Sequence, residues 1–255
     1  LILVRVQAAL RKIKIKKMEN HLLHVALIPD GNRRWAKKRG FLPWIGHRAG
    51  MKNLEKLLEK WQKIGFPYFT FWGSSWDNLT KRSKKEVEFL IKIFEESFNK
   101  LAKSKEVHQN EVNIKVIGRW EEIFPESTKR SAKKVMEKTK NYKKFFLTLL
   151  MAYDGRQEMI SVLKKIVDEV LQKKEKIKIN EKTIEKYLWT GKLPDVDLII
   201  RTGCEGDPHN SAGFMMWKTS YSQFYFTETL FPDFSPNEFE KAINDFKKRE
   251  RRFGK

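Results

Sequence analysis

The sequence predicts an α/β protein built on a mostly parallel central sheet of about six strands, with helices on both faces. Apolar runs alternate with helical patterns from residue 24 to the end of the chain. The apolar runs are continuous rather than alternating, which is typical of parallel strands that are covered on both sides. We find no repeat and no linker, so we expect a basic N-terminal extension at residues 1–21 and one domain at residues 22–255.

Six apolar runs are the candidate strands of this sheet. Taken in chain order, they are residues 24–28, 68–72, 112–118, 145–153, 197–203 and 223–229.

Helical periodicity fills most of the intervals between the strands. Residues 51–64 place apolar side chains on one face, and Gly65 suits the C-cap. Residues 84–103 are apolar around more than one face, and residues 156–172 form a further helix. The last helix starts at Ser235, which is followed by Pro at N1 and Glu at N3 in the pattern of a capping box.

Composition limits the classes of function. The chain has 255 residues, 40% of them hydrophobic, which is enough for a real core. The 53 basic and 32 acidic residues leave a net charge of +21, which favours anionic partners such as nucleic acid, phosphorylated metabolites or an anionic membrane. One cysteine, Cys204, excludes an intramolecular disulfide and a Cys-cluster zinc site and fits a reducing, cytoplasmic compartment.

Membrane contact is expected at the surface of the bilayer only. We see no apolar run near the roughly 20 residues that span a bilayer. The basic extension at residues 1–21 could rest on anionic lipid, and a frayed, solvated terminus explains it about equally well.

The first candidate site follows the strand at residues 24–28. In open α/β sheets, ligands lie beyond the carboxyl ends of the strands. Here the strand ends at Asp30, and the N–H groups of the next helix, with Arg34 and Arg39, suit a phosphate. A carboxylate repels a phosphate unless a divalent cation separates them, so Asp30 predicts Mg²⁺. An ordinary turn with a capping aspartate explains the same residues with about even odds.

Other strand ends and helix starts are also polar. His47 lies in "GHRAG", where a capping or packing role is the simpler interpretation of this residue alone. Residues 72–83 join small and amide residues to Arg82 and fit either a mobile, substrate-covering loop or a solvated turn. The stretch "MAYDGRQEM" opens a helix with Gly–Arg, and "DLIIRTGCEGDPHNSAGF" delivers Arg201 into a glycine-rich loop.

Six stretches together resemble the cis-prenyltransferase family, which includes undecaprenyl and dehydrodolichyl diphosphate synthases. In family order over residues 22–255, they are "HVALIPDGNRRWAKKRG", "GHRAG", "AYDGRQE", "DLIIRTG", "FYFTETLFPDF" and "RRFG". The resemblance implies a homodimer of sheet-centred subunits, each with a hydrophobic tunnel. It also implies Mg²⁺ as cofactor and transfer of an allylic prenyl group from a prenyl diphosphate donor to isopentenyl diphosphate.

The resemblance also implies a role for individual residues. Asp30 resembles the catalytic, Mg²⁺-linked aspartate, and Asn78 resembles the catalytic asparagine of the family's flexible loop, at a spacing one residue longer. Arg201 matches the first arginine of the acceptor-diphosphate site. Arg252 and Gly254 match a C-terminal motif that reaches across the dimer. The full substrate-binding set is Gly31, Asn32, Arg34, Trp35, Arg39, His47, Arg82, Arg201, Arg252 and Gly254.

These residues suit the ionisation of an allylic diphosphate. Breaking the C–O bond leaves negative charge on the diphosphate and positive charge on carbon. Arginines, helix N–H groups and a cation stabilise the first, and apolar walls keep water from the second. The apolar helix at residues 84–103 is a candidate wall of the tunnel, although plain core packing is the commoner role of such residues.

The sequence departs from the family pattern around the acceptor site. The family continues R-T-S-G-E-x-R-L-S-N-F, whereas this chain reads "RTGCEGDPHNSAGF", which is about three residues longer and has no second arginine. Asp207, His209 and Ser211 occupy this loop and become candidate acceptor-site residues. Gln223 stands where the family has a metal-binding Glu, and a neutral amide is a poorer ligand of Mg²⁺.

From these departures we expect a prenyltransferase whose acceptor is not isopentenyl diphosphate but, for example, a hydroxylated aromatic or a lipid precursor. The lost charge-assisted hydrogen bond is worth roughly 1.5–3 kcal/mol of diphosphate binding. The alternative is an ordinary chain-elongating cis-polyprenyl diphosphate synthase with a divergent loop. A nucleic-acid-binding module is a remote alternative, and we expect no nucleic-acid partner because the basic residues are spread along the chain.

Overall fold

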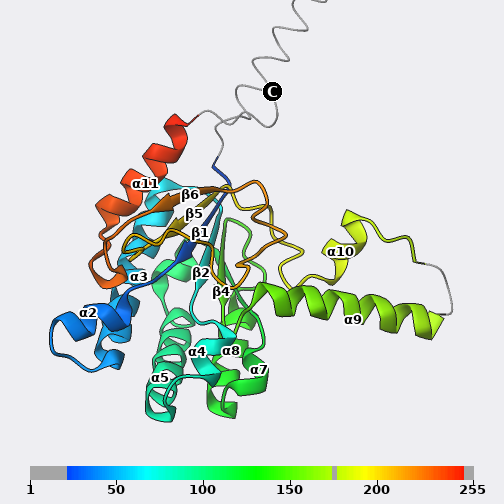
Figure 1. Ribbon diagram of the computed structural model, residues 1–255, viewed down its shortest axis with the longest axis horizontal. Coiled ribbons are helices and arrows are strands. Elements are labelled where there is room, and N and C mark those ends of the chain that lie inside the picture. The colour runs from blue at the N-terminus through cyan, green and yellow to red at the C-terminus, as the bar shows by residue number, and fades with distance from the viewer. Residues whose placement is uncertain (1–21, 174–176, 250–255) are drawn as a thin grey trace, which may run out of the picture.

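The computed structural model describes residues 22–173 and 177–249 (Figure 1). The expected extension at residues 1–21, like Arg252 and Gly254, lies outside the described residues. Within these two ranges, six parallel strands form one sheet in the order β3-β4-β2-β1-β5-β6. The strands are β1 (His24–Ile28), β2 (Tyr68–Trp72), β3 (Val112–Ile117), β4 (Phe145–Leu150), β5 (Leu198–Arg201) and β6 (Gln223–Phe226). The predicted α/β class and strand number are confirmed.

The helices between the strands are more numerous than the periodicity predicted. They are α2 (Asn32–Lys38), α3 (Pro43–Ile64), α4 (Trp76–Thr80), α5 (Lys84–Leu101), α6 (Lys105–Gln109), α7 (Trp120–Ile123), α8 (Glu126–Thr139), α9 (Gly155–Lys173), α10 (Glu181–Tyr187), the 3₁₀ helix η1 (Phe231–Asp233) and α11 (Pro236–Lys248). The helix expected from residue 51 begins eight residues earlier, at Pro43, because a proline fits the first helical position, where no N–H is needed. The predicted cap at Ser235 is confirmed as a capping box with Glu238.

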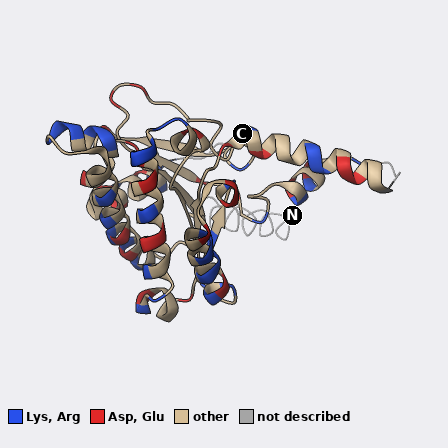
Figure 2. Cartoon of the chain, turned by 90° about the horizontal axis from the view of Figure 1, so that it is seen from below, with Lys and Arg blue, Asp and Glu red and all other residues tan. Residues whose placement is uncertain are grey.

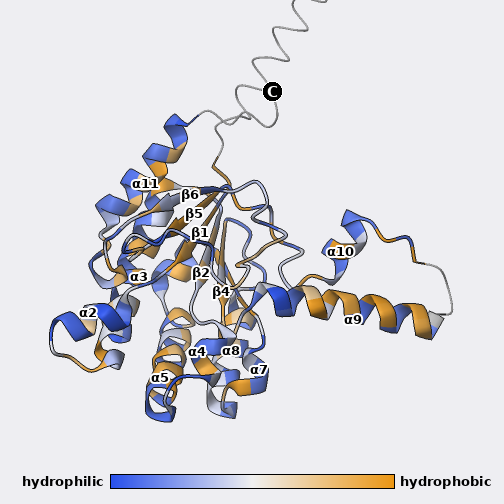
Figure 3. Ribbon diagram, viewed as in Figure 1, coloured by the Kyte–Doolittle hydropathy of each residue, from blue (hydrophilic) through white to orange (hydrophobic). Residues whose placement is uncertain are grey.

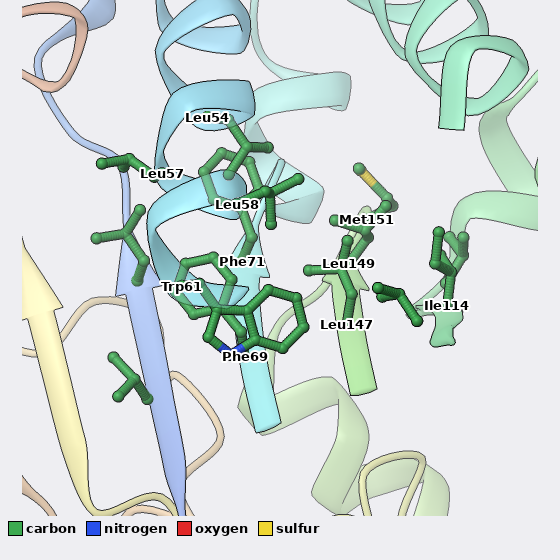
Figure 4. Packing of buried hydrophobic residues seen from close by; sticks show 14 of the residues in the cluster. Leu54, Leu57, Leu58, Trp61, Phe69, Phe71, Ile114, Leu147, Leu149 and Met151 are labelled. Atoms are coloured by element: carbon green, nitrogen blue, oxygen red, sulfur yellow. The ribbon is translucent and has the colours of Figure 1, made fainter. Parts of the chain in front are cut away.

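One face of the sheet is buried by helix α3. Leu54, Leu57, Leu58 and Trp61 point from this helix onto Phe69 and Phe71 of β2 and onto side chains of β4 (Figure 4). The Trp61 ring lies edge-on to Phe145 at 5.3 Å, and its indole N–H donates to the Phe66 carbonyl at 2.7 Å. The largest core side chain is therefore both packed and hydrogen-bonded.

The opposite face is covered largely by the connecting segments around β5. Phe214 and Met215, together with Leu193 and Val196, pack on residues of β1, β4 and β5. Helices α9 and α10 extend away from the sheet at one end of the molecule (Figure 1). Val162 and Ile166 of α9 pack on Leu188, which directly follows α10, and on Ile184 of α10. In the described ranges, we find no helix with the length and apolar character needed to cross a bilayer.

The strand register decides where a site can form. Ile28, the last residue of β1, lies opposite Arg201, the last residue of β5, and Trp72 lies opposite Leu150. The carboxyl ends of these four strands therefore meet along one edge of the sheet. The loops that follow them carry the residues singled out by the sequence.

At the other edge, His24 makes the fold sensitive to pH. Its ring is fully buried, with Nδ1 3.0 Å from the Pro194 carbonyl oxygen and Nε2 2.8 Å from the Thr70 hydroxyl. Burial lowers the pKa of His24 from 6.5 to about 4. Because the folded pKa is depressed, the unfolded chain binds more protons between these values. The contribution of neutral His24 to the free energy of unfolding is therefore fully present above pH 6.5. It is lost as the pH falls towards 4.

We predict that acidification from pH 6.5 to pH 4 costs about 3 kcal/mol of unfolding free energy through His24 alone. Urea unfolding of the wild type and of His24→Gln across this range measures it. The variant is less stable at pH 7 but has a shallower pH dependence. Equal slopes in the two proteins would contradict the assignment to His24.

Candidate active site

The turn after β1 is shaped by contacts that only glycine permits. Gly31 has φ of +106°, and a Cβ atom there would lie 2.7 Å from a methyl carbon of Leu230. The carbonyl oxygen of Asp30 accepts hydrogen bonds from the Phe231 N–H at 3.0 Å and the Thr202 hydroxyl at 2.8 Å. Asp30 is thus held by the segments that follow three neighbouring strands.

The carboxylate of Asp30 lies between two arginines. Its Oδ1 accepts from the Gly31 N–H at 2.6 Å and lies 3.1 Å from Nη2 of Arg34, and its Oδ2 lies 3.1 Å from Nη2 of Arg201. Arg34 is held in turn by the Gly203 carbonyl at 2.6 Å and by Glu205 at 2.8 Å. The predicted residues Asp30, Arg34 and Arg201 therefore form one ion-paired group.

A cavity of about 250 Å³ opens beside this group. Its wall combines polar residues with apolar ones. The polar part includes Asp30, Asn32, His47, Asn78, Arg82, Arg201 and Ser211, and the apolar part includes Met51, Phe71, Trp72, Leu90, Phe94 and Phe231. Leu90 and Phe94 come from α5, so part of the apolar surplus of the helix expected at residues 84–103 lines this cavity, and part packs in the core.

The cavity wall holds three buried polar atoms that have no hydrogen-bond partner in the described part of the chain. They are Oδ1 of Asn32, Nε1 of Trp72 and Nε of Arg201. A buried polar group without a partner costs about 1–3 kcal/mol, so proteins rarely keep one without a reason. Two of the three are donors, which is the chemistry that an anionic ligand in this cavity would satisfy.

A second charged group centres on Glu86, a residue that the sequence analysis missed. This carboxylate is only 5% exposed, and its Oε1 lies 3.1 Å from Arg82 Nη1, 3.2 Å from His47 Nε2 and 3.5 Å from Arg33 Nε. The hydrogen bond with His47 is the main cause that lowers the pKa of Glu86, and burial lowers the pKa of His47. The neutral imidazole of His47 and the guanidinium of Arg82 thus both face the cavity, and both are held by the Glu86 carboxylate.

The sequence did contain a weak signal for Glu86. It stands three residues after Ser83, whose hydroxyl oxygen accepts from the Glu86 N–H and caps α5. Such spacing predicts a helix start and gives no hint of the two arginines and the imidazole that gather around the side chain.

Trp35 and Arg39 lie together at the outer side of α2. Arg39 stacks over the Trp35 ring at 4.2 Å, and both side chains bind the carboxylate of Asp233 in η1, at 2.7 Å for the indole and 3.1 Å for the guanidinium. Neither is among the described residues that line the cavity. Asp233 is a further anchor that the sequence analysis did not single out.

Asn78 lies in the first turn of α4, on the cavity wall. Its N–H donates to the Ser75 hydroxyl at 3.0 Å, and its side-chain oxygen accepts from the Ser75 N–H at 3.4 Å, which completes a capping box. The loop after β2 thus carries Asn78 to the same cavity as Asp30.

The long loop after β5 returns to the site at Ser211. Nη1 of Arg201 donates to the Ser211 hydroxyl at 2.7 Å and to the His209 carbonyl at 2.6 Å. The imidazole of His209 lies 3.0 Å from the exposed carboxylate of Asp207. Of the described residues, the cavity wall includes Ser211 but neither Asp207 nor His209.

Gln223 is not brought to this site within the single chain. It begins β6 opposite Leu198, at the far end of β5 from Arg201. Its side-chain oxygen accepts from Arg249 at 3.3 Å.

The fold and the site define an α/β enzyme with a basic and acidic centre over a partly apolar cavity. The sequence model of the family described as "Putative undecaprenyl diphosphate synthase" matches residues 28–254. The chain therefore belongs to the undecaprenyl diphosphate synthase family, and it is a prenyltransferase.

Individual relatives agree with this membership. A Pyrococcus furiosus protein named tritrans,polycis-undecaprenyl-diphosphate synthase (geranylgeranyl-diphosphate specific) is 40% identical, over 91% of this chain and 86% of its own. An isoprenyl transferase of Clostridium perfringens is 38% identical, over 91% and 89%. The solved structure of lavandulyl diphosphate synthase from Lavandula x intermedia, in complex with dimethylallyl diphosphate, has a TM-score of 0.84 at 30% identity and covers 93% of this chain and 100% of that one.

The expectation of an acceptor other than isopentenyl diphosphate is wrong. The relatives that match most of the chain are named undecaprenyl diphosphate synthases, which are chain-elongating enzymes. The physical reason lies in the loop after β5. The extra residues bulge into solvent at positions 205–210, and Ser211 still returns to bind Arg201, so the length of the loop does not remove this contact.

We predict that Glu86→Gln lowers the free energy of unfolding by about 3 kcal/mol, because it removes a buried carboxylate and leaves half-buried Arg82 without its counter-ion. Urea unfolding at pH 7 measures the change. The matched control is Glu88→Gln, an exposed position on the same helix, which should change stability by less than about 0.5 kcal/mol. Equal losses in the two variants would show that Glu86 is no anchor.

Proposed function

We propose that this protein is a cis-polyprenyl diphosphate synthase that adds isopentenyl diphosphate units to an allylic diphosphate. The observation that carries the proposal is the cavity beside Asp30, where arginine and amide groups with unpaired atoms adjoin an apolar wall. An amphiphile with a diphosphate head and an isoprenoid tail fits both halves of such a wall. The names of the archaeal relatives support geranylgeranyl diphosphate as the allylic substrate and an undecaprenyl product.

Mg²⁺ is the cofactor that suits the acidic residue in this cavity. The Asp30 carboxylate is 40% exposed and lines the cavity, which leaves it accessible to a cation. Among the described residues, no three His, Cys, Asp or Glu side chains gather into a complete metal cage. That agrees with Mg²⁺, which is usually bound by one or two carboxylates together with substrate phosphates and water. When bound, Mg²⁺ would offset the negative charge of the leaving diphosphate.

The residues around the donor site would hold the diphosphate as it leaves. The N–H groups that begin α2 and the guanidinium of Arg34 would donate hydrogen bonds to phosphate oxygens, and Arg39 could join them only by leaving Asp233. Gly31 allows the helix start to approach closely, and Asn32 and Trp35 follow it on α2. His47 and Arg82, both anchored on Glu86, face the cavity from the other side. These groups would stabilise charge that develops as the allylic C–O bond breaks.

The residues around Arg201 would bind the diphosphate of isopentenyl diphosphate. The Nε–H of Arg201 has no partner among residues 22–173 and 177–249, and the Ser211 hydroxyl next to it can turn from the arginine to a phosphate oxygen. Asn78 lies across the same cavity and would orient the reacting ends of the two substrates. The apolar part of the wall, which includes Phe71, would exclude water from the electron-poor carbon.

We predict that Asp30→Ala lowers turnover of geranylgeranyl diphosphate with labelled isopentenyl diphosphate and Mg²⁺ by about a hundredfold or more. Radiolabelled product extracted into organic solvent measures it. The control is Asp207→Ala, because this exposed carboxylate is remote from the cavity wall and its loss should leave turnover nearly unchanged. A fully active Asp30→Ala, or a wild type with no elongation, would sink the proposal.

We also propose that residues 22–255 act as one domain in a homodimer that works in the cytoplasm, in contact with lipid. Helix α9 supports the dimer, because Ile160, Leu163, Val167 and Val170 are exposed along one of its faces. The hydropathy colouring shows this apolar character on the helix that extends from the body (Figure 3). A second copy is the occupant that suits such a stripe, because a two-fold axis would pair it with itself.

Placing charge on this stripe tests the dimer. We predict that Leu163→Glu with Val167→Glu shifts the protein from dimer to monomer in analytical ultracentrifugation, since two carboxylates on each copy would meet across the axis. The matched control is Lys164→Glu with Asp168→Glu on the exposed side next to the stripe, which should leave the mass unchanged. A wild type that sediments as a monomer contradicts the dimer directly.

A further inference from the structure

The turn between α2 and α3 exposes apolar side chains at the tip of the molecule. Phe41 is 51% exposed, Leu42 57% and Ile45 40%. In Figure 1 this connection forms the end of the molecule opposite α9. Three large apolar side chains within five residues make a contiguous patch, and such a patch on a soluble surface marks an interaction site more often than a single exposed residue does.

The backbone of this turn is held in place by contacts on both sides of the exposed residues. The Phe41 N–H donates to the Ala36 carbonyl at 2.9 Å, and Pro43 starts α3. One residue further on, the Trp44 ring stacks on Phe89 of α5, with the ring centroids 4.7 Å apart and the planes 6° from parallel. A patch held in place loses little conformational entropy when it binds.

Basic residues surround the patch. Arg33 and Lys37 line a shallow hollow of about 440 Å³ together with Gly40, Phe41 and Pro43. On the other side, Nζ of Lys85 lies 5.2 Å from the centre of the Trp44 ring. Figure 2 shows the Lys and Arg residues of α2 gathered at this end of the molecule.

The charge at this end is only partly neutralised. Lys38 is paired with Glu205, and Arg39 is paired with Asp233. For Lys37 and Lys85, the described residues provide no carboxylate partner within ion-pair distance. Apolar side chains surrounded by uncompensated cations match one leaflet of an anionic bilayer. In such a leaflet, a zone of negatively charged phosphates lies above the apolar acyl chains.

We propose that the α2–α3 turn docks this protein on an anionic phospholipid bilayer. Phe41, Leu42 and Ile45 enter the boundary between headgroups and acyl chains, and Lys37 and Lys85 contact lipid phosphates. A second copy of the chain is a poorer occupant, because a two-fold contact would bring the basic ring of one copy against the same ring of the other.

Docking here places the site next to the lipid. Helix α2, which carries Arg33 and Lys37 of the basic residues around the patch, begins at Asn32 on the cavity wall and also carries Arg34. An apolar substrate could therefore pass between bilayer and cavity without crossing much water. The docking itself requires no step of the proposed reaction, so it can be measured with no substrate present.

The test is sedimentation of the full chain with vesicles of phosphatidylcholine mixed with phosphatidylglycerol. The variant Phe41→Ser with Leu42→Ser should bind about tenfold more weakly, because two apolar side chains no longer leave water. The variant Lys37→Gln with Lys85→Gln should lose roughly tenfold as well, and its remaining binding should depend less on salt. Wild-type binding should weaken strongly on vesicles of phosphatidylcholine alone.

The matched control is Tyr221→Ser with Ile179→Ser, which removes one exposed aromatic and one exposed aliphatic side chain elsewhere on the surface. This control should bind vesicles like the wild type, and circular dichroism should show that all the variants are folded. Binding that is unchanged in Phe41→Ser with Leu42→Ser overturns the proposal. So does a wild-type oligomer that this variant dissociates, because the patch would then be covered by another copy.

Discussion

The parallel pairing of β1 with β5 is the constraint on which the site depends. It sets Ile28 opposite Arg201, and three residues beyond Ile28 the chain turns at Gly31. The carboxylate of Asp30 then lies 3.1 Å from each of two guanidinium groups, which come from segments about 170 residues apart. Since each charge has a partner, the arginines are held in place before any ligand arrives. Under the proposed function, a diphosphate that enters the cavity finds its donors preorganised.

The other charged groups of the site are held by the same principle. Glu86 holds Arg82 and His47, Asp233 holds Trp35 and Arg39, and Glu205 holds Arg34. In each case a carboxylate positions a cationic or aromatic side chain, and the carboxylate itself takes no direct part in the proposed reaction. The cost of leaving a buried charge unpaired explains the close pairing of Glu86, whereas the more exposed Asp233 and Glu205 chiefly fix the positions of the arginines. The surface carries exposed apolar residues at both ends of the molecule. One set is the stripe on α9, and the other is the α2–α3 turn, which is surrounded by basic residues.

Much of the fold follows from local patterns. Continuous apolar runs predicted all six strands, and Ser235 with the proline after it predicted the start of α11. The motifs also predicted Asp30, Arg34, Asn78 and Arg201 as members of one site, and the structure brings these four together. The hypothesis about the acceptor rested on a missing second arginine, a longer loop after β5 and Gln223, and the names of the relatives overturn it. A loop can lengthen at little cost in free energy and still return to the same point, as this one does at Ser211.

The sequence by itself determined the class of fold and the family, because strand periodicity and short motifs depend on neighbouring residues, and it predicted the donor side of the site. Only the tertiary structure decided which carboxylate holds which cation and where Gln223 lies. It also revealed that Phe41 and Leu42 stay exposed while equally apolar residues of α3 are buried. These are outcomes of strand register and helix packing, which join residues far apart in the chain. No local pattern records how such segments meet.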